Sequence, residues 1–204
     1  MSDSTVQVVV LVGSLRRDSI NRRLAQAAAD NAPTGVRVRL VDGLGRLPFY
    51  NEDIDNEDID NEDIDNKDID PSTSPEAGAL DPAVTDLREH VGAADAVLVV
   101  TPEYNGSTPA VLKNAIDWLS RPYGSGALKD KPVGVIGAAL GRYAGSWSRA
   151  DTRKSIGVAG GRVVEEVDFG FQTSGLTDGA LPDEVVDGVG AAVRVLADQV
   201  AARA

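Results

Sequence analysis

The stretch that decides the fold is Ala96-Val97-Leu98-Val99-Val100-Thr101-Pro102-Glu103-Tyr104-Asn105-Gly106-Ser107. Its first five residues are all apolar, which is typical of a strand that has helices on both faces. The next seven hold Pro102 and the turn-forming pair Asn105-Gly106, which predict a tight loop. Open α/β sheets bind their ligands at loops of this kind, which follow the carboxyl end of a buried strand.

Apolar runs alternate with helical patterns along the rest of the chain. We expect strands at 6–12, 36–41, 95–101, 132–138 and 162–167, and helices at 20–31, 82–93, 109–120, 146–156 and 183–202. Strands that alternate with helices form a parallel sheet with right-handed crossovers. Five strands favour one doubly wound α/β domain over 1–204, with strand order 2-1-3-4-5 and helices on both faces. In that order the direction of winding switches between the first and third strands, so loops 13–21 and 101–107 are expected to meet there.

The composition narrows the possible functions. The 204 residues include no cysteine, which excludes disulfides, thiolate nucleophiles and cysteine-based metal sites. The formal net charge is −12, but residues 51–70 hold eleven acidic residues and one lysine, which account for −10 of it. No cluster of Lys and Arg indicates nucleic-acid binding, and no apolar run reaches the roughly 18 residues of a membrane span. We expect a cytoplasmic protein in which the apolar run 6–12 is a strand rather than a signal peptide.

Residues 51–70 form a repeat. The unit Asn51-Glu-Asp-Ile-Asp55 recurs twice unchanged, and a fourth copy carries Lys67 in place of Glu. A period of five places the isoleucines on one face of neither a helix nor a strand, and dense like charge opposes packing. We expect a solvated loop inserted in the domain; weak cation binding and one coil of a pentapeptide solenoid are alternatives. An EF-hand is excluded because Asp58 stands where that calcium loop needs glycine.

The loop that precedes the first predicted helix reads Gly13-Ser14-Leu15-Arg16-Arg17-Asp18-Ser19-Ile20-Asn21. Helix N-terminal amides, hydroxyls and a cation suit a phosphate group, so Ser14, Arg16, Ser19 and Asn21 are candidate ligands. The alternative is that Ser19 or Asn21 only caps the helix. The loop contains neither the Gly-x-Gly-x-x-Gly fingerprint of dinucleotide-binding folds nor the Gly-Lys-Ser/Thr of nucleotide-triphosphate loops.

The loop 101–107 suits a flat ring with polar edges, such as a flavin. Pro102 and Asn105-Gly106 allow a turn that directs several main-chain amides and carbonyls to one ring edge. Tyr104 can wall one face of a ring or pack against the protein. We interpret Glu103 as a brace for the loop rather than as an acid catalyst.

Together these loops resemble the NADPH-dependent FMN reductase family, which has a flavodoxin-like fold. The family's Gly-Ser-x-Arg-x-x-Ser-x-Asn loop matches 13–21 throughout, and its Thr/Ser-Pro-Glu-Tyr-Asn-Gly-Ser loop matches 101–107. Its helix signature Leu-Lys-Asn-Ala-x-Asp-Trp matches 112–118, and Leu-Pro-x-Tyr-Asn-x-Asp matches 47–53. The family pattern has one Asn-Glu-Asp unit after the tyrosine, where this chain has four repeat units.

The resemblance implies a set of cofactor contacts. It places Ser14, Arg16, Ser19 and Asn21 on the FMN phosphate, and Pro102, Glu103, Tyr104, Asn105 and Gly106 around the isoalloxazine, largely through the main chain. In the family's third loop Gly141 keeps its place, whereas Leu140 and Ala144 replace a proline and a glycine.

The resemblance also implies a reaction and an assembly. Hydride would pass from NADPH or NADH to FMN, and then to a small-molecule electron acceptor such as a flavin, quinone, azo compound, nitro compound or metal oxyanion. This chemistry requires no side-chain acid or base and no metal ion. The family further implies a homodimer or a dimer of dimers, with no nucleic-acid or membrane partner.

Two other functions stay open at this point. A dinucleotide-binding dehydrogenase would use Asp42 on a ribose, but the glycine fingerprint is missing and Asp42-Gly43 is typical of a turn. An FMN-binding electron carrier of the flavodoxin type would share the fold without turnover. His90, the one histidine, falls in a predicted surface helix and is not expected to be catalytic. We expect deletion of 56–70 to leave FMN affinity nearly unchanged, because the repeat lies outside both loops.

Overall fold

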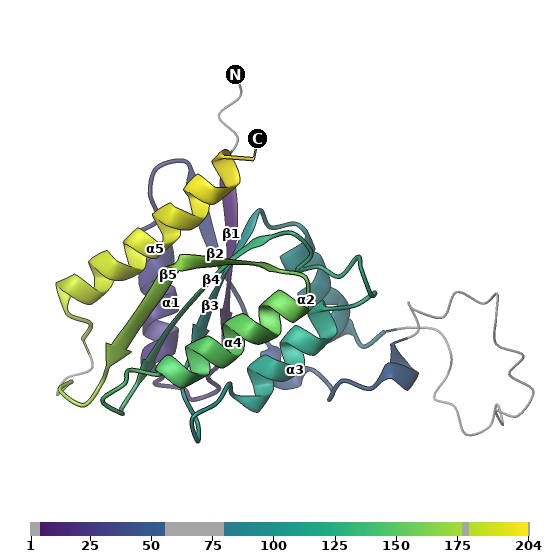
Figure 1. Cartoon of the computed structure of the whole chain (residues 1–204), viewed down its shortest axis with the longest axis horizontal. Coiled ribbons are helices and arrows are strands. Elements are labelled where there is room, and N and C mark those ends of the chain that lie inside the picture. The colour runs from purple at the N-terminus through teal and green to yellow at the C-terminus, as the bar shows by residue number, and fades with distance from the viewer. Residues whose placement is uncertain (1–4, 56–79, 177–179, 204) are drawn as a thin grey trace, which may run out of the picture.

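The computed structural model describes residues 5–55, 80–176 and 180–203, which form a parallel sheet between two layers of helices (Figure 1). The strands are β1 (Val6–Val12), β2 (Val36–Val41), β3 (Ala96–Thr101), β4 (Pro132–Ala139) and β5 (Arg162–Gln172). The α-helices are α1 (Ile20–Asp30), α2 (Pro82–Gly92), α3 (Ala110–Leu119), α4 (Ser146–Val158) and α5 (Asp183–Ala201). The strand order β2-β1-β3-β4-β5 confirms the predicted doubly wound sheet.

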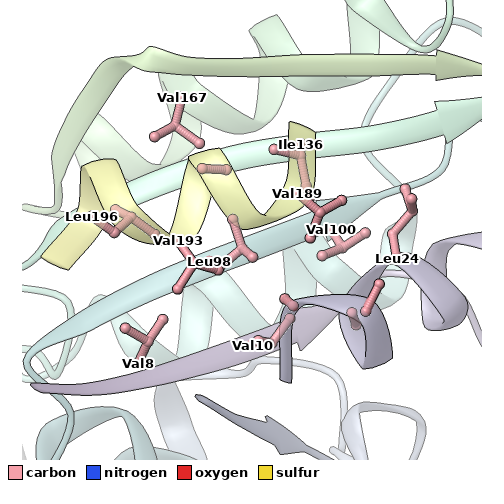
Figure 2. Close-up of a cluster of buried hydrophobic side chains, with 14 of the residues drawn as sticks. Val8, Val10, Leu24, Leu98, Val100, Ile136, Val167, Val189, Val193 and Leu196 are labelled. Atoms are coloured by element: carbon pink, nitrogen blue, oxygen red, sulfur yellow. The ribbon is translucent and has the colours of Figure 1, made fainter. Parts of the chain in front are cut away.

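Strand β3 divides the core in two. Leu98 and Val100 lie on the face that α1 and α5 cover, in the cluster of buried side chains that Figure 2 shows. Val97 and Val99 lie on the opposite face, in a second cluster with residues of α2, α3 and α4. All six residues of β3 are buried. The prediction that helices cover both faces of this apolar strand is therefore confirmed.

Strand β5 is longer than predicted. It ends at Gln172, whereas the sequence indicated an end at residue 167. Its register with β4 shifts near Val135, and there Arg153 of α4 donates to the carbonyls of Val135 (3.1 Å) and Val167 (3.0 Å). Arg153 also pairs with Asp168 at 2.7 Å. Asp168 can therefore lie inside β5, because α4 supplies its counter-charge. This charged residue interrupts the apolar pattern of the strand sequence.

The first repeat unit is part of the folded body. Residues 51–55 include a short 3-10 helix, η2 (Glu52–Ile54), and the side chain of Asp55 is buried. This differs from the solvated loop that the sequence predicted for 51–70. The remaining copies, at 56–70, lie outside the described residues.

Candidate functional site

Three loops lie at the carboxyl edge of the sheet: 13–19 after β1, 102–109 after β3, and 140–145 after β4. The first two loops are in contact at Gly13, whose N–H donates to the Val100 carbonyl at 2.9 Å. A Cβ on Gly13 would lie 3.1 Å from Leu112 and 3.3 Å from Pro102, which is a tight fit. The absence of a side chain at Gly13 therefore lets the two loops approach each other.

The first loop offers main-chain donors that the protein itself does not use. Among the residues that the structure describes, the N–H groups of 14–17 make no hydrogen bond. Ser14 and Ser19 are buried, whereas Arg16 is exposed. Ser19 is the N-cap of α1, because its hydroxyl accepts from the N–H of Arg22 at 3.4 Å. That role uses an acceptor lone pair and leaves the O–H of Ser19 to donate to a ligand.

Asn21 has a role that the sequence did not suggest. Its side-chain amide donates to the Ala138 carbonyl (2.9 Å) and accepts from the Ala138 N–H (2.8 Å). Asn21 is 4% exposed, so this pair ties the first turn of α1 to the end of β4 inside the protein. The side chain therefore fixes where the N-terminus of α1 lies, and it is not the helix cap.

The second loop turns through left-handed backbone. Asn105 and Gly106 have φ angles of 52° and 74°, and Tyr104 and Ser107 exchange two main-chain hydrogen bonds of 3.4 and 3.1 Å. The predicted turn at Asn105-Gly106 is thus present. In the described part of the chain, the N–H groups of Glu103, Asn105 and Gly106 make no hydrogen bond. They are available to an acceptor on a ligand edge.

Glu103 braces the second loop against α4. Its Oε2 accepts from the N–H of Trp147 (3.0 Å) and of Ser148 (3.1 Å), the second and third residues of the helix. The residue at the N-cap, Gly145, has no side chain to satisfy these amides. A carboxylate at a helix N-terminus is favoured by the helix dipole, so Glu103 acts as a cap from another segment. The structure confirms its interpretation as a brace.

Asp151 of α4 holds the far end of the same loop. Its Oδ2 accepts from the hydroxyl of Ser107 (2.5 Å) and from the N–H of Thr108 (3.3 Å). These hydrogen bonds, with that of Ser107 the strongest influence, hold the pKa of Asp151 below its ordinary value. The carboxylate therefore stays ionised near neutral pH and keeps both bonds.

The third loop departs from the family pattern but is held in place. Ala144 has a φ of 49°, a left-handed conformation that suits the glycine it replaces. Its carbonyl accepts from Nη1 of Arg149 (2.5 Å), and Nε of Arg149 bonds Asp168 (2.8 Å). Gly141 is exposed, and a Cβ there would have no atom within 4 Å. No packing within the described residues requires glycine at 141.

Exposed apolar side chains concentrate around these loops. Of the eight large hydrophobic residues that are exposed in the described part of the chain, five belong to the three loops or the first turn of α4: Leu15, Tyr104, Leu140, Tyr143 and Trp147. Tyr143 and Trp147 contact each other with ring centroids 5.1 Å apart. A patch of apolar groups bordered by unused amides is typical of a binding site for a flat organic molecule.

Other features of the described residues give no competing site. No group of three or more His, Asp or Glu within them is arranged to hold a metal ion. His90 is half-buried and contacts the carbonyl of Asp86 (2.6 Å) in its own helix. A cavity of about 580 Å³ lies between the C-terminal parts of α3 and α4, at the opposite edge of the sheet from the three loops. None of the described helices has the length and apolar character that spanning a membrane requires.

The chain is similar to known proteins over most of its length. The model of the NADPH-dependent FMN reductase family matches residues 6–175. A quinone reductase of Pseudomonas putida is 39% identical over 149 residues, which are 73% of this chain and 68% of the relative. A 2-hydroxy-1,4-benzoquinone reductase of a Burkholderia species is 40% identical over 136 residues, 67% of this chain and 62% of the relative.

Among solved structures, the flavoenzyme NAD(P)H:(acceptor) oxidoreductase FerB of Paracoccus denitrificans is similar over 96% of this chain and 97% of its own. The TM-score is 0.73 and the sequence identity is 29%. The matched segment 6–175 contains all three loops of the candidate site. The chain therefore belongs to the NADPH-dependent FMN reductase family, a family of flavodoxin-like oxidoreductases that use FMN and NAD(P)H.

Proposed function

We propose that this protein binds FMN across the three loops and reduces quinones with NADPH or NADH. The observation that carries the proposal is the row of unused main-chain donors at 14–17, set beside exposed apolar side chains at the switch point of the sheet. An FMN molecule needs both features, because its phosphate requires donors and its ring requires apolar walls with a polar edge.

The phosphate would be held by the first loop. The hydroxyls of Ser14 and Ser19, the main-chain amides of 14–17 and the guanidinium of Arg16 supply neutral donors and a formal positive charge. The N-terminus of α1 adds the positive end of its dipole. Because the side chain of Asn21 is engaged with Ala138, we assign to Asn21 its main-chain N–H and the positioning of this helix end.

The ring system would lie against the second and third loops. Pro102, Glu103, Asn105 and Gly106 would meet its polar edge through the main chain, and Tyr104 would wall one side. Gly141 supports this placement, since the space over its Cα is open and a ligand can approach the backbone closely.

The chain's own groups would act on charge and on water. FMN, when bound, supplies the hydride-accepting centre. The N–H groups of Glu103, Asn105 and Gly106 would stabilise negative charge on the reduced ring, as fixed dipoles do at an oxyanion hole. Tyr143 and Trp147 would shield the ring from water and provide an aromatic surface for a flat acceptor. No described side chain needs to transfer a proton.

A quinone is the acceptor class that we favour. Two of the relatives above are named quinone and benzoquinone reductases, and quinones are flat rings that stack on aromatic side chains.

We also propose a homodimer. The apolar residues Leu112, Ala115, Ile116 and Leu119 of α3 do not support one, because they are buried within the subunit. Support comes instead from Tyr123 and Val158, which line the cavity between α3 and α4 and are 88% and 84% exposed. Size-exclusion chromatography with light scattering measures the mass of the protein in solution and so tests the dimer.

One experiment tests the proposed function as a whole. The purified protein is supplied with FMN and desalted, its visible spectrum is recorded, and the chromophore released by heat is identified. Benzoquinone and NADPH are then added, and NADPH consumption is followed. We expect stoichiometric FMN and many turnovers per FMN. Retained FMN with one reduction and no turnover indicates a carrier, and a colourless protein refutes the site.

A further inference from the structure

A cavity adjoins the first loop on the side away from the second loop. Its volume is about 230 Å³, and it lies at the carboxyl ends of β1 and β2, so the first loop separates it from the crevice proposed for FMN. Ser14 and Leu15 line it from the first loop, and its charged residues are Arg22, Asp42 and Arg46. The two arginines outnumber the one aspartate, so this cavity, which we call the Arg46 cavity, favours an anionic group.

Asp42 does not oppose such a group with an unpaired charge. Its Oδ1 pairs with Nη2 of Arg22, from α1, at 2.6 Å. Dinucleotide-binding folds use an acidic residue beyond the first loop for the ribose hydroxyls of NAD, or a nearby arginine for the 2′-phosphate of NADP. This chain has both residue types at the end of β2, and Arg22 neutralises the acid. The pair therefore reduces the repulsion that Asp42 would exert on a phosphate.

Arg46 supplies the charge that the protein itself does not use. Among the described residues, its guanidinium has no hydrogen bond or ion pair. It lies close against the main chain of Gly43, where a Cβ would come within 2.6 Å of Nη2 of Arg46. Gly43 has a φ of 93°, and its carbonyl accepts from the N–H of Arg46 at 2.8 Å. A short turn thus places an unpaired guanidinium, with its planar set of donors, beside Asp42.

We propose, on the basis of the function proposed above, that the Arg46 cavity binds the 2′-phosphate of NADPH and makes the enzyme prefer NADPH to NADH. That phosphate is the group by which the two reductants differ, and it carries about two negative charges at neutral pH. Arg22 and Arg46 would both donate to it. The other cations near the crevice have their own partners, since Arg16 is assigned to the FMN phosphate and Arg142 donates to the hydroxyl of Tyr143.

The position of the cavity fits the path that the reductant must take. Its nicotinamide has to lie on the flavin ring, between the second and third loops, so its adenosine end must leave the crevice past a neighbouring loop. The Arg46 cavity lies directly beyond the first loop and shares Ser14 and Leu15 with it. It is smaller than the about 300–1,000 Å³ of pockets that enclose a whole ligand, which suits one phosphate group rather than a complete dinucleotide.

Substitution of Arg46 tests the assignment by substrate preference. In the FMN-loaded enzyme we expect Arg46→Ala to lower kcat/KM about tenfold for NADPH and less than about twofold for NADH. Arg37→Ala is the matched control, because it removes the same charge from an exposed position near the amino end of β2. It should change both values less than about twofold. A parent enzyme that uses NADPH and NADH equally well would overturn the proposal, and so would an Arg46→Ala variant that weakens both substrates by the same factor.

Asp42→Asn gives a test in the opposite direction. The amide oxygen can still accept from Arg22, while the negative charge beside the phosphate is removed. We expect the preference for NADPH over NADH to rise about threefold. A preference that stays the same or falls would count against the proposal, because Asp42 would then not face the 2′-phosphate.

Direct binding separates this proposal from the proposed function. Calorimetric titration of the FMN-loaded protein with adenosine 2′,5′-bisphosphate requires no turnover, and bound FMN keeps the 5′-phosphate out of the first loop. We expect Arg46→Ala to weaken this binding about tenfold and to leave FMN affinity unchanged. If the protein reduces quinones but Arg46→Ala binds the bisphosphate as the parent does, the function stands and the cavity assignment falls. If the bisphosphate binds through Arg46 but no quinone is reduced, the cavity assignment stands and the reductase function falls.

Discussion

Replacement of Glu103 tests whether α4 holds the second loop in place. Glu103→Ala removes the carboxylate that accepts two N–H bonds, at 3.0 and 3.1 Å, from Trp147 and Ser148. A lost helix cap costs about 0.5–2 kcal/mol, and hydrogen bonds to a charged group lie toward the upper end of such values. We therefore expect a loss of about 2 kcal/mol, which for a domain of this size lowers Tm by about 4–8 °C.

Glu103→Gln separates the hydrogen bonds from the charge. The amide oxygen can still accept at the end of α4, so mainly the attraction to the helix dipole is lost, about 0.3–1 kcal/mol. The expected fall in Tm is about 1–4 °C. Glu166 provides the control, because it is an exposed acidic residue of β5 and lies at no helix end. Glu166→Ala should lie within about 2 °C of the parent.

The same variants link the brace to ligand binding. Without the Glu103 carboxylate, FMN binding has to order the second loop. If this ordering costs about 1.4 kcal/mol of the binding free energy, Glu103→Ala weakens FMN affinity about tenfold. Fluorescence titration of FMN measures this, and differential scanning fluorimetry measures the Tm. A Glu103→Ala protein with the Tm and FMN affinity of Glu166→Ala would refute the reasoning, because the two amides at the start of α4 would then need no partner.

Three further predictions concern the site. Arg16→Ala should weaken FMN binding about tenfold through loss of one charge-assisted contact, whereas Arg17→Ala, an equal change at the next exposed position, should weaken it less than about twofold; titration at two salt concentrations checks both. Gly141→Ala should leave Tm unchanged, because its Cβ has open space in the protein, and should lower FMN affinity if the ring edge lies there. Asp151 has a pKa below its ordinary value, so the stability it contributes is complete above the ordinary carboxyl pKa, near 3.9, and is lost as pH falls through the lower folded value. Asp151→Asn should therefore reduce Tm at pH 7 and make its fall between about pH 4 and pH 2 shallower, and parallel Tm curves for the two proteins would contradict this.

The fold was predictable from the sequence because its strongest signals are local. The run of β3 is apolar throughout because both of its faces are covered, and that pattern needs no knowledge of distant residues. The end of β5 was not predictable in this way. The strand has a polar residue, Asp168, at this position because Arg149 and Arg153 of the preceding helix α4 pair with it, at 2.8 and 2.7 Å. A contact across that separation leaves no periodic mark on the strand.

The loops of the candidate site were predictable as segments but not as contacts. The spacing of residues 13–21 and 101–107 identified where a ligand would be bound, and Ser19 was among the expected caps. The use of Asn21 was hidden, because its partner Ala138 lies 117 residues away. Asn can serve a phosphate, a helix end or a main-chain pair equally well, and three-dimensional position alone decides which of these it does.

Helix α4 shows why the periodicity of apolar residues does not reveal polar contacts between a helix and a loop. Its buried residues are Ser148, Arg149, Thr152 and Ile156, three of them polar, and its sequence alone resembles that of a surface helix. The hydroxyl of Ser148 donates to the Pro102 carbonyl at 2.8 Å, and Arg149 holds the carbonyl of Ala144 in the third loop. The polar side chains of α4 are buried because they satisfy main-chain groups of two loops. Since loops carry few apolar anchors of their own, a helix that must fix them requires hydrogen-bonding residues where a packing helix would have leucine or valine.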